Sequence, residues 1–183
     1  AEIGWLAGVQ ASEWSWGPIF VDLDLDGWED LIVSNGNKYD LQNADIAAGI
    51  EELKKQGRLS HAEVLKLLER FARLESTKPI WRNTGKLTFE DKSLEWGFGG
   101  IEVSHGMALA DLDNDGDFDV VMNNLGTPAG IFRNQATAPR VAVRLKGRAP
   151  NTRGTGAKIE YFGGPLPQSQ EMISAGRYLS SDD

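Results

Sequence analysis

Two segments of nine residues carry acidic side chains at a spacing that suits the binding of a hard cation. Residues 22–30 read DLDLDGWED and residues 111–119 read DLDNDGDFD, so both fit the pattern D-x-D-x-D-G-x-x-D. Carboxylates at positions 1, 3, 5 and 9 of a tight loop form an oxygen cage of the kind that Ca²⁺ prefers, and position 7 usually adds a backbone carbonyl. The glycine at position 6 permits the sharp turn, because a Cβ atom there would obstruct the backbone.

The spacing therefore predicts two calcium ions, one in each loop. The predicted ligands of the first ion are the carboxylates of Asp22, Asp24, Asp26 and Asp30 and the carbonyl of Trp28. The predicted ligands of the second ion are the carboxylates of Asp111, Asp113, Asp115 and Asp119 and the carbonyl of Asp117. A single acidic loop is often only a solvated turn, but two complete copies favour metal binding. Without a cation, four carboxylates this close would repel one another.

The residues on both sides of each loop are typical of buried strands. Residues 19–21 (IFV) and 31–33 (LIV) enclose the first loop, and residues 108–110 (ALA) and 120–122 (VVM) enclose the second. An EF-hand would have helices there and a glutamate at loop position 12, where this chain has a valine in one copy and a methionine in the other. The pattern predicts a loop that joins two strands of a β-repeat protein.

The repeated unit is longer than its loop. Residues 15–17 (SWG) precede the first loop by the same distance as residues 104–106 (SHG) precede the second, with an offset of 111 − 22 = 89 residues. Further along the chain, residues 80–83 (IWRN) correspond to residues 131–134 (IFRN). Units of several strands that recur in this way indicate a propeller-like array.

One insertion, between Asn37 and Pro79, lengthens the first unit. Its apolar residues follow a helical period in two stretches, and Ser60 and Glu63 predict a capping box at the start of the second helix. The second helix is predicted to bury the stripe Val64, Leu67, Leu68, Phe71 and Leu74. We expect this hairpin to pack on its own domain; the alternative is a lid that binds a partner.

The two acidic loops, the Ser-x-Gly before each and the Arg-Asn strand ends resemble the FG-GAP or VCBS repeat of integrin-type β-propellers. The resemblance covers residues 1–134 apart from the insertion at 37–79. It implies a mainly β fold with partial propeller-type repeats, about two blades. Residues 135–183 resemble the start of an ASPIC/UnbV domain, through Gly154, residues 156–158 (GAK) and residues 176–180 (GRYLS). The chain is therefore expected to be truncated at both ends, with too few repeats to close a propeller.

Composition narrows the possible partners and chemistry. The net charge is −8 over 183 residues, which argues against nucleic acid and against anionic membrane surfaces, and no apolar run long enough to insert into a membrane is present. The chain has no cysteine, which excludes disulfides, thiolate metal sites and cysteine nucleophiles. Its two histidines form no zinc pattern, and no nucleophile elbow occurs.

These observations and the resemblance predict a non-enzymatic, calcium-stabilised module that is secreted, periplasmic or on the cell surface. Its expected role is adhesion to, or recognition of, a protein or polysaccharide. The alternative is a carbohydrate-active enzyme or its accessory domain. A pair of carboxylates outside the calcium loops, facing one pocket, would favour the enzyme.

Two further expectations concern packing. Residues 140–145 (RVAVRL) alternate as a strand should, and we expect them to pair with the outer edge of the second repeat, which would otherwise stay open. Trp5, Trp16, Trp81 and Trp96 are expected in the core. The side chain of Trp28 is expected to pack on a neighbour, the alternative being that it stacks on a sugar.

Overall fold

The computed structural model describes residues 2–57, 59–164 and 166–173, and in them the chain is mainly β. Nine strands form three antiparallel sheets, accompanied by three helices. No helix in the described ranges is long and apolar enough to cross a membrane. The sequence-based prediction of a mainly β chain with a two-helix insertion and a C-terminal β segment is confirmed at this level.

The first sheet has the order β1-β2-β3-β4 and the second has the order β5-β6-β7. The strands of the first sheet are β1 (Ser15–Val21), β2 (Asp30–Asn35), β3 (Ile80–Asn83) and β4 (Phe89–Asp91). Those of the second are β5 (Ser104–Ala110), β6 (Asp119–Asn124) and β7 (Gly130–Phe132). The strands predicted on either side of each acidic loop are therefore confirmed as β1, β2, β5 and β6.

The first two strands of each sheet form the same hairpin. Val21 pairs with Asp30 at the end of β1, and Ala110 pairs with Asp119 at the end of β5. The acidic loops are thus the connections of two equivalent hairpins. Both hairpins also shift register just after the serine that starts their first strand, Ser15 in one and Ser104 in the other.

The two sheets pack against each other through a shared apolar core, but they use opposite faces. The first sheet contributes Ile19, Val21, Ile32 and Ile80, and the second contributes Met107, Leu109, Val120 and Met122. With the 89-residue offset, Ile19 and Ile32 correspond to Ala108 and Val121. These two residues pair with each other on the other face of the second sheet, outside the shared core. The two sheets therefore pack with non-equivalent faces toward each other.

The second face of the first sheet is closed by other parts of the same unit. Leu31, Val33 and Trp81 form a small core there, against which Val9 and Phe89 pack. Helix α1 (Gly4–Ala7) lies just before Val9 and buries only Ala7. The prediction that Trp5 is a core residue is wrong, because α1 turns its side chain outward and leaves it 78% exposed.

The insertion forms two capped helices, α2 (Ala44–Gln56) and α3 (His61–Leu68). The predicted capping box is present: the hydroxyl of Ser60 accepts the backbone N–H of Glu63, whose carboxylate accepts the backbone N–H of Ser60. Helix α3 ends before the predicted stripe does, and it contains no buried residue.

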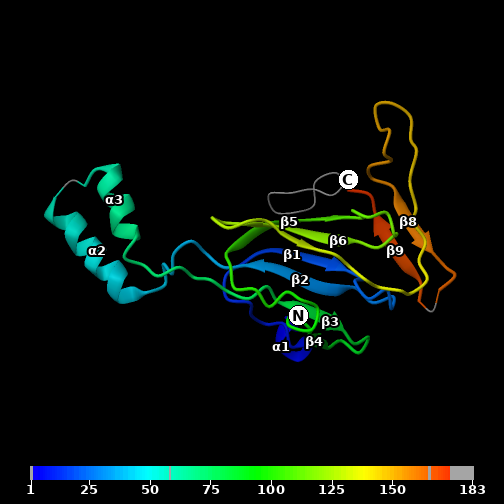
Figure 1. Cartoon of the computed structure of the whole chain (residues 1–183), viewed down its shortest axis with the longest axis horizontal. Coiled ribbons are helices and arrows are strands. Elements are labelled where there is room, and N and C mark those ends of the chain that lie inside the picture. Colours follow the sequence, from blue (N-terminus) through cyan, green and yellow to red (C-terminus); the bar gives the residue numbers. More distant parts are fainter. Residues whose placement is uncertain (1, 58, 165, 174–183) are drawn as a thin grey trace.

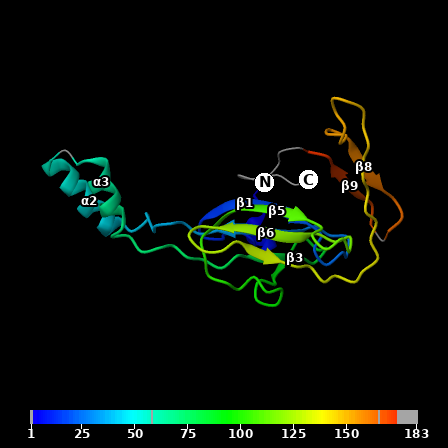
Figure 2. The same cartoon turned by 45° about the horizontal axis from the view of Figure 1, so that its top comes forward.

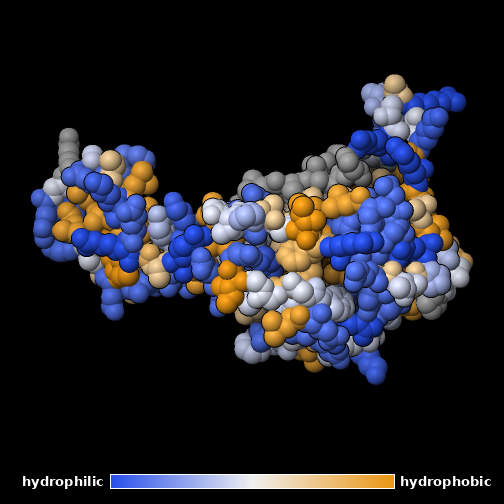
Figure 3. Space-filling view, in the orientation of Figure 1, coloured by the Kyte–Doolittle hydropathy of each residue, from blue (hydrophilic) through white to orange (hydrophobic). Residues whose placement is uncertain are grey.

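This helical hairpin stands away from the sheets in both views (Figures 1 and 2). The expectation that it packs on its own domain is wrong. Two extended segments hold it at a distance and pair with each other through Asn37 and Leu74, whose N–H groups each donate to the other's carbonyl, at 2.9 and 3.1 Å. Apolar side chains of the hairpin remain on the surface (Figure 3), with Leu65 48% exposed.

Because Asn37 and Leu74 already meet, we expect the sheets to fold without the hairpin. A variant in which a short Gly-Ser-Gly turn replaces residues 39–72 should keep its β circular-dichroism spectrum. Its melting temperature should stay within a few degrees of the parent, since α3 buries nothing that the sheets need. Loss of the folded spectrum in this variant would show that the hairpin is part of the fold's core.

The C-terminal part forms a separate two-stranded sheet of β8 (Lys158–Tyr161) and β9 (Gln168–Glu171). Residues 140–145 form no strand, so the expected pairing with the edge of the second sheet is wrong. The reason lies at its first residue: Arg140 bonds to the second acidic loop and to the carbonyl of Ala136, which directs the chain toward the loop and away from β7. Among the described residues, no strand covers the outer edge of β7. The expectations for residues 176–180 lie outside the described residues.

Candidate metal centres

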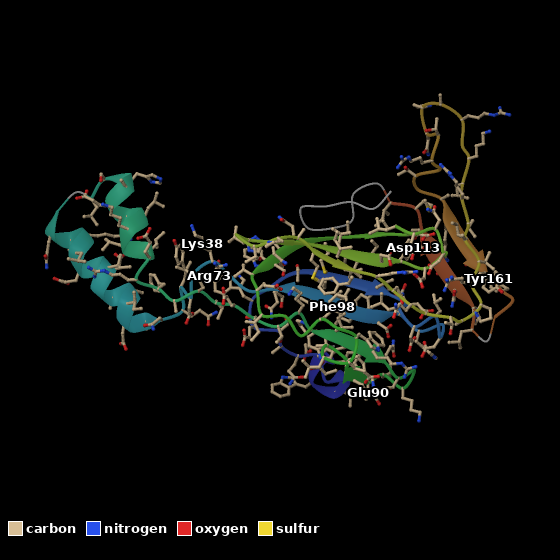
Figure 4. All side chains as sticks on the ribbon, in the orientation of Figure 1. Lys38, Arg73, Glu90, Phe98, Asp113 and Tyr161 are labelled. Atoms are coloured by element: carbon tan, nitrogen blue, oxygen red, sulfur yellow. The ribbon has the colours of Figure 1, made fainter. Side chains whose placement is uncertain are left out.

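The two acidic loops lie at the same end of the stacked sheets, opposite the helical hairpin. Figure 4 shows Asp113 of the second loop at this end, whereas Lys38 and Arg73 mark the segments that lead to the hairpin. The loops connect β1 to β2 and β5 to β6, so the hairpin registers described above determine how far apart their first and last aspartates lie.

The aspartate at position 1 closes each loop. The carboxylate of Asp22 accepts the N–H groups of Asp26 and Gly27 at 3.0 and 2.8 Å. In the second loop, the carboxylate of Asp111 accepts the corresponding N–H groups, both at 3.0 Å. Two left-handed residues make this turn possible, the glycine at position 6 and the residue at position 4. The residue at position 4 is Leu25 (φ 59°) or Asn114 (φ 61°), and this strain at position 4 was not predicted.

The aspartate at position 9 ties each loop to the chain at the end of the third strand of its sheet. Asp30 is fully buried and accepts the N–H groups of Leu23 and Asn83, at 3.0 and 2.8 Å. Asp119 is also buried and accepts the N–H groups of Leu112 and Asn134, at 2.9 and 2.8 Å.

The structure thus explains the asparagine of the recurring Arg-Asn strand ends. Its backbone N–H donates to the buried aspartate, and its side-chain amide adds a second hydrogen bond to a loop. The Asn83 amide donates to the carbonyl of Glu29 at 3.0 Å, and the Asn134 amide donates to the carbonyl of Leu23 at 2.8 Å. The second of these bonds reaches from the second repeat into the first loop and links the two loops.

The arginine of the same strand ends contacts the aspartate at position 3. Arg82 donates to Asp24 and also to Asp26, and Arg133 pairs with Asp113 at 2.5 Å. These guanidinium groups neutralise part of the acidic charge of the loops. Asp26 is turned toward Arg82 and does not join the group of converging oxygens described next.

Three carboxylates in each loop converge on one point. In the first loop they belong to Asp22, Asp24 and Asp30, and in the second to Asp111, Asp113 and Asp115. Within each trio, one oxygen from every residue lies within 4.8 Å of the others. Since calcium–oxygen distances are about 2.3–2.6 Å, two oxygens on one ion are separated by about 5 Å at most, and both trios fit that limit.

The electrostatics of the first loop favour a cation. Asp24 Oδ1 is buried without a hydrogen-bond partner, and burial raises the pKa of Asp30 to about 7 despite its two backbone hydrogen bonds. Burial also raises the pKa of Asp22. A cation among these oxygens would stabilise the charged carboxylates and so lower both pKa values. The donor set is all oxygen, which suits a hard ion such as Ca²⁺.

The second loop has an additional buried carboxylate at position 7. The side chain of Asp117 is buried, which raises its pKa, and its Oδ1 atom has no hydrogen-bond partner. Arg140 pairs with its other oxygen at 3.3 Å and donates to the carbonyl of Asp115 at 2.9 and 2.6 Å. The role of Arg140 was not predicted from the sequence, because nothing in the local spacing connects it with a loop more than 20 residues earlier.

The C-terminal region therefore lies against both loops. Arg140 borders Gly116, where an added Cβ would come within 3.2 Å of its Nε atom. Leu166 and Gln168 border Gly27, where an added Cβ would come within 3.4 and 3.3 Å of their side chains. Substituting either glycine would thus both strain its positive φ and crowd this contact.

Trp28 occupies position 7 of the first loop, and its ring packs on the turn between β3 and β4. A Cβ atom added at Gly85 would lie 2.8 Å from the indole ring. The ring thus makes the expected contact with a neighbouring turn, while Trp28 stays 40% exposed. The carbonyl groups of Trp28 and Asp117 remain predicted ligands.

Comparison with known proteins found no match to this chain. No protein-family model matches the chain, no curated protein matches it, and no solved structure matches it.

Proposed function

We propose that the chain is a calcium-stabilised, non-catalytic binding module of FG-GAP or VCBS type, with a propeller-like arrangement of its sheets. The observation that carries this proposal is the repeated hydrogen-bond scheme of the two loops. In both, the aspartates at positions 1 and 9 accept equivalent backbone N–H groups, and an arginine pairs with the aspartate at position 3. A scheme that recurs in this detail supports one role shared by both loops, and the two oxygen trios support the proposal that this role is to hold a hard cation.

The propeller-like arrangement is supported by the packing of non-equivalent faces of the two sheets. A sandwich would bring equivalent faces of two sheets together, whereas here Ile32 of one sheet packs in the core and its counterpart Val121 faces away from it. Stacking that repeats the same rotation from one sheet to the next generates an array. Strands β8 and β9 form the C-terminal β segment. We propose that this segment is the start of an ASPIC/UnbV-like domain.

A binding role is favoured by the pairing of the carboxylates near the loops. The cavity beside the first loop is lined by two acidic residues, Asp24 and Glu95. Asp24 belongs to the first oxygen trio and Glu95 forms an exposed ion pair with Lys92, so the residues lining this cavity include no pair of carboxylates outside the acidic loops, which the glycosidase alternative would need. We therefore propose recognition of a protein or polysaccharide, outside the cell or in the periplasm, as the role of the module.

Calorimetric titration with CaCl₂ tests the ion sites. The parent protein should bind two ions, and the Asp24→Ala and Asp113→Ala variants should each bind one, because each substitution removes an oxygen from a single trio. Asp45→Ala, which removes an exposed carboxylate of α2, should still bind two. A stoichiometry of two in the Asp24→Ala and Asp113→Ala variants would place the ions elsewhere.

A further inference from the structure

A cavity of about 520 Å³ lies between the two repeats, next to the first acidic loop. Its walls come from the first loop, from the segment that joins the two sheets, from the second loop and from the residues after β7. The volume falls in the range of small-molecule sites.

Aromatic rings form one side of the cavity. Phe98 and Phe132 stack with their centroids 4.0 Å apart and their planes at 17°, and Phe98 is only 5% exposed, so this wall is anchored in the shared core. Trp96 packs against the same core, and Phe118 of the second loop is 44% exposed. The cavity thus offers fixed apolar faces with one ring open to solvent.

Charged groups line the cavity, but each already has an opposite partner. Asp24 pairs with Arg82, and Arg133 pairs with Asp113 at 2.5 Å. Glu95 pairs with Lys92 at 2.6 Å. A charged ligand would have to break one of these pairs, whereas a neutral polar ligand can share them. Gln135 adds an exposed amide that can both donate and accept.

We infer that this cavity binds the ring of a neutral saccharide. The C–H face of a pyranose would lie on Phe118 and Trp96, while its hydroxyl groups would bond to the planar polar groups of Arg133 and Gln135. Guanidinium and amide groups each present at least two polar atoms in one plane, which suits neighbouring hydroxyls. This inference rests on the proposed function and specifies its ligand class.

The cavity shares a residue with the first candidate metal centre. Asp24 lines the cavity and also belongs to the first oxygen trio. An ion in that loop would fix the wall that Leu23 and Asp24 contribute to the cavity, so saccharide binding is expected to depend on calcium.

The test is calorimetric titration of the full chain at saturating calcium with glucose, galactose, mannose, N-acetylglucosamine, cellobiose and maltose. At least one of these sugars should bind to one site, and Phe118→Ala should weaken it by about tenfold or more, a loss of about 1.4 kcal/mol. Phe20→Ala removes a phenylalanine that is 56% exposed but lies outside the cavity, and it should bind as the parent does. Replacing calcium with a chelator should also weaken binding.

The outcomes separate this inference from the proposed function. If calcium raises the melting temperature but none of the six sugars binds, the saccharide inference is overturned and the ion sites stand. If a sugar binds equally well to Phe118→Ala, the cavity is the wrong site. If only an aromatic peptide tested in parallel binds, and Phe118→Ala abolishes that binding, the cavity recognises protein and the saccharide assignment fails.

Discussion

Replacing Asp30 with alanine is expected to destabilise the protein by about 3 kcal/mol or more, even without calcium. The carboxylate is fully buried and accepts two backbone N–H groups, from Leu23 and Asn83. Alanine would leave both donors unsatisfied, and each buried unsatisfied group costs about 1–3 kcal/mol. In a protein of this size, that loss corresponds to a melting temperature lower by about 6–12 °C.

Urea denaturation in the presence of a chelator measures this effect apart from ion binding. Asp119→Ala should behave similarly, because Asp119 holds the corresponding two N–H groups of the second loop. Glu29→Ala, next to Asp30 but exposed, is the matched control and should unfold at the parent's urea concentration. Equal midpoints for Asp30→Ala and the parent would mean that the loop is not braced through this carboxylate.

Calcium itself is expected to produce the second large effect. An ion that binds only the folded chain stabilises it by about 2.7 kcal/mol when its free concentration is about 100 times Kd. With two such sites, the melting temperature should rise by about 10–20 °C over the chelated protein.

Variants that lack one site should show a smaller calcium-dependent rise in melting temperature. Asp24→Ala and Asp113→Ala should each keep only part of the calcium-dependent shift, since the trio of the other loop remains complete. Differential scanning calorimetry with calcium, with magnesium and with chelator measures the shift, and Asp45→Ala serves as the control. Identical melting curves in calcium and in chelator would refute a structural role for the ion.

The local features of the fold were predictable because they depend on short-range spacing. The acidic loops, their flanking strands and the capping box at Ser60 and Glu63 each lie within a few residues of sequence. The Arg-Asn strand ends could be recognised in the sequence as a repeat, but their hydrogen bonds to the acidic loops could not be predicted. Asn83 bonds to Asp30 across 53 residues, and only the sheet brings the two together.

Two of the wrong predictions concern the partners of a segment. Alternation in residues 140–145 indicated a strand, yet alternation does not specify a neighbour, and the ionic contacts of Arg140 with the second loop direct the chain elsewhere. The apolar residues of the insertion correctly predicted two helices, but the expectation that these helices pack on their own domain was wrong. The backbone pairing of Asn37 with Leu74 holds the hairpin away from the sheets.

A crystal structure of the protein grown with CaCl₂ would show whether the two acidic loops hold calcium. We expect one calcium ion in each loop, with oxygens of Asp22, Asp24 and Asp30 around the first and of Asp111, Asp113 and Asp115 around the second, at about 2.3–2.6 Å. We also expect the carbonyl oxygens of Trp28 and Asp117 to complete the two sites. Loops that hold only water and the guanidinium groups of Arg82 and Arg133 at saturating calcium would contradict this expectation.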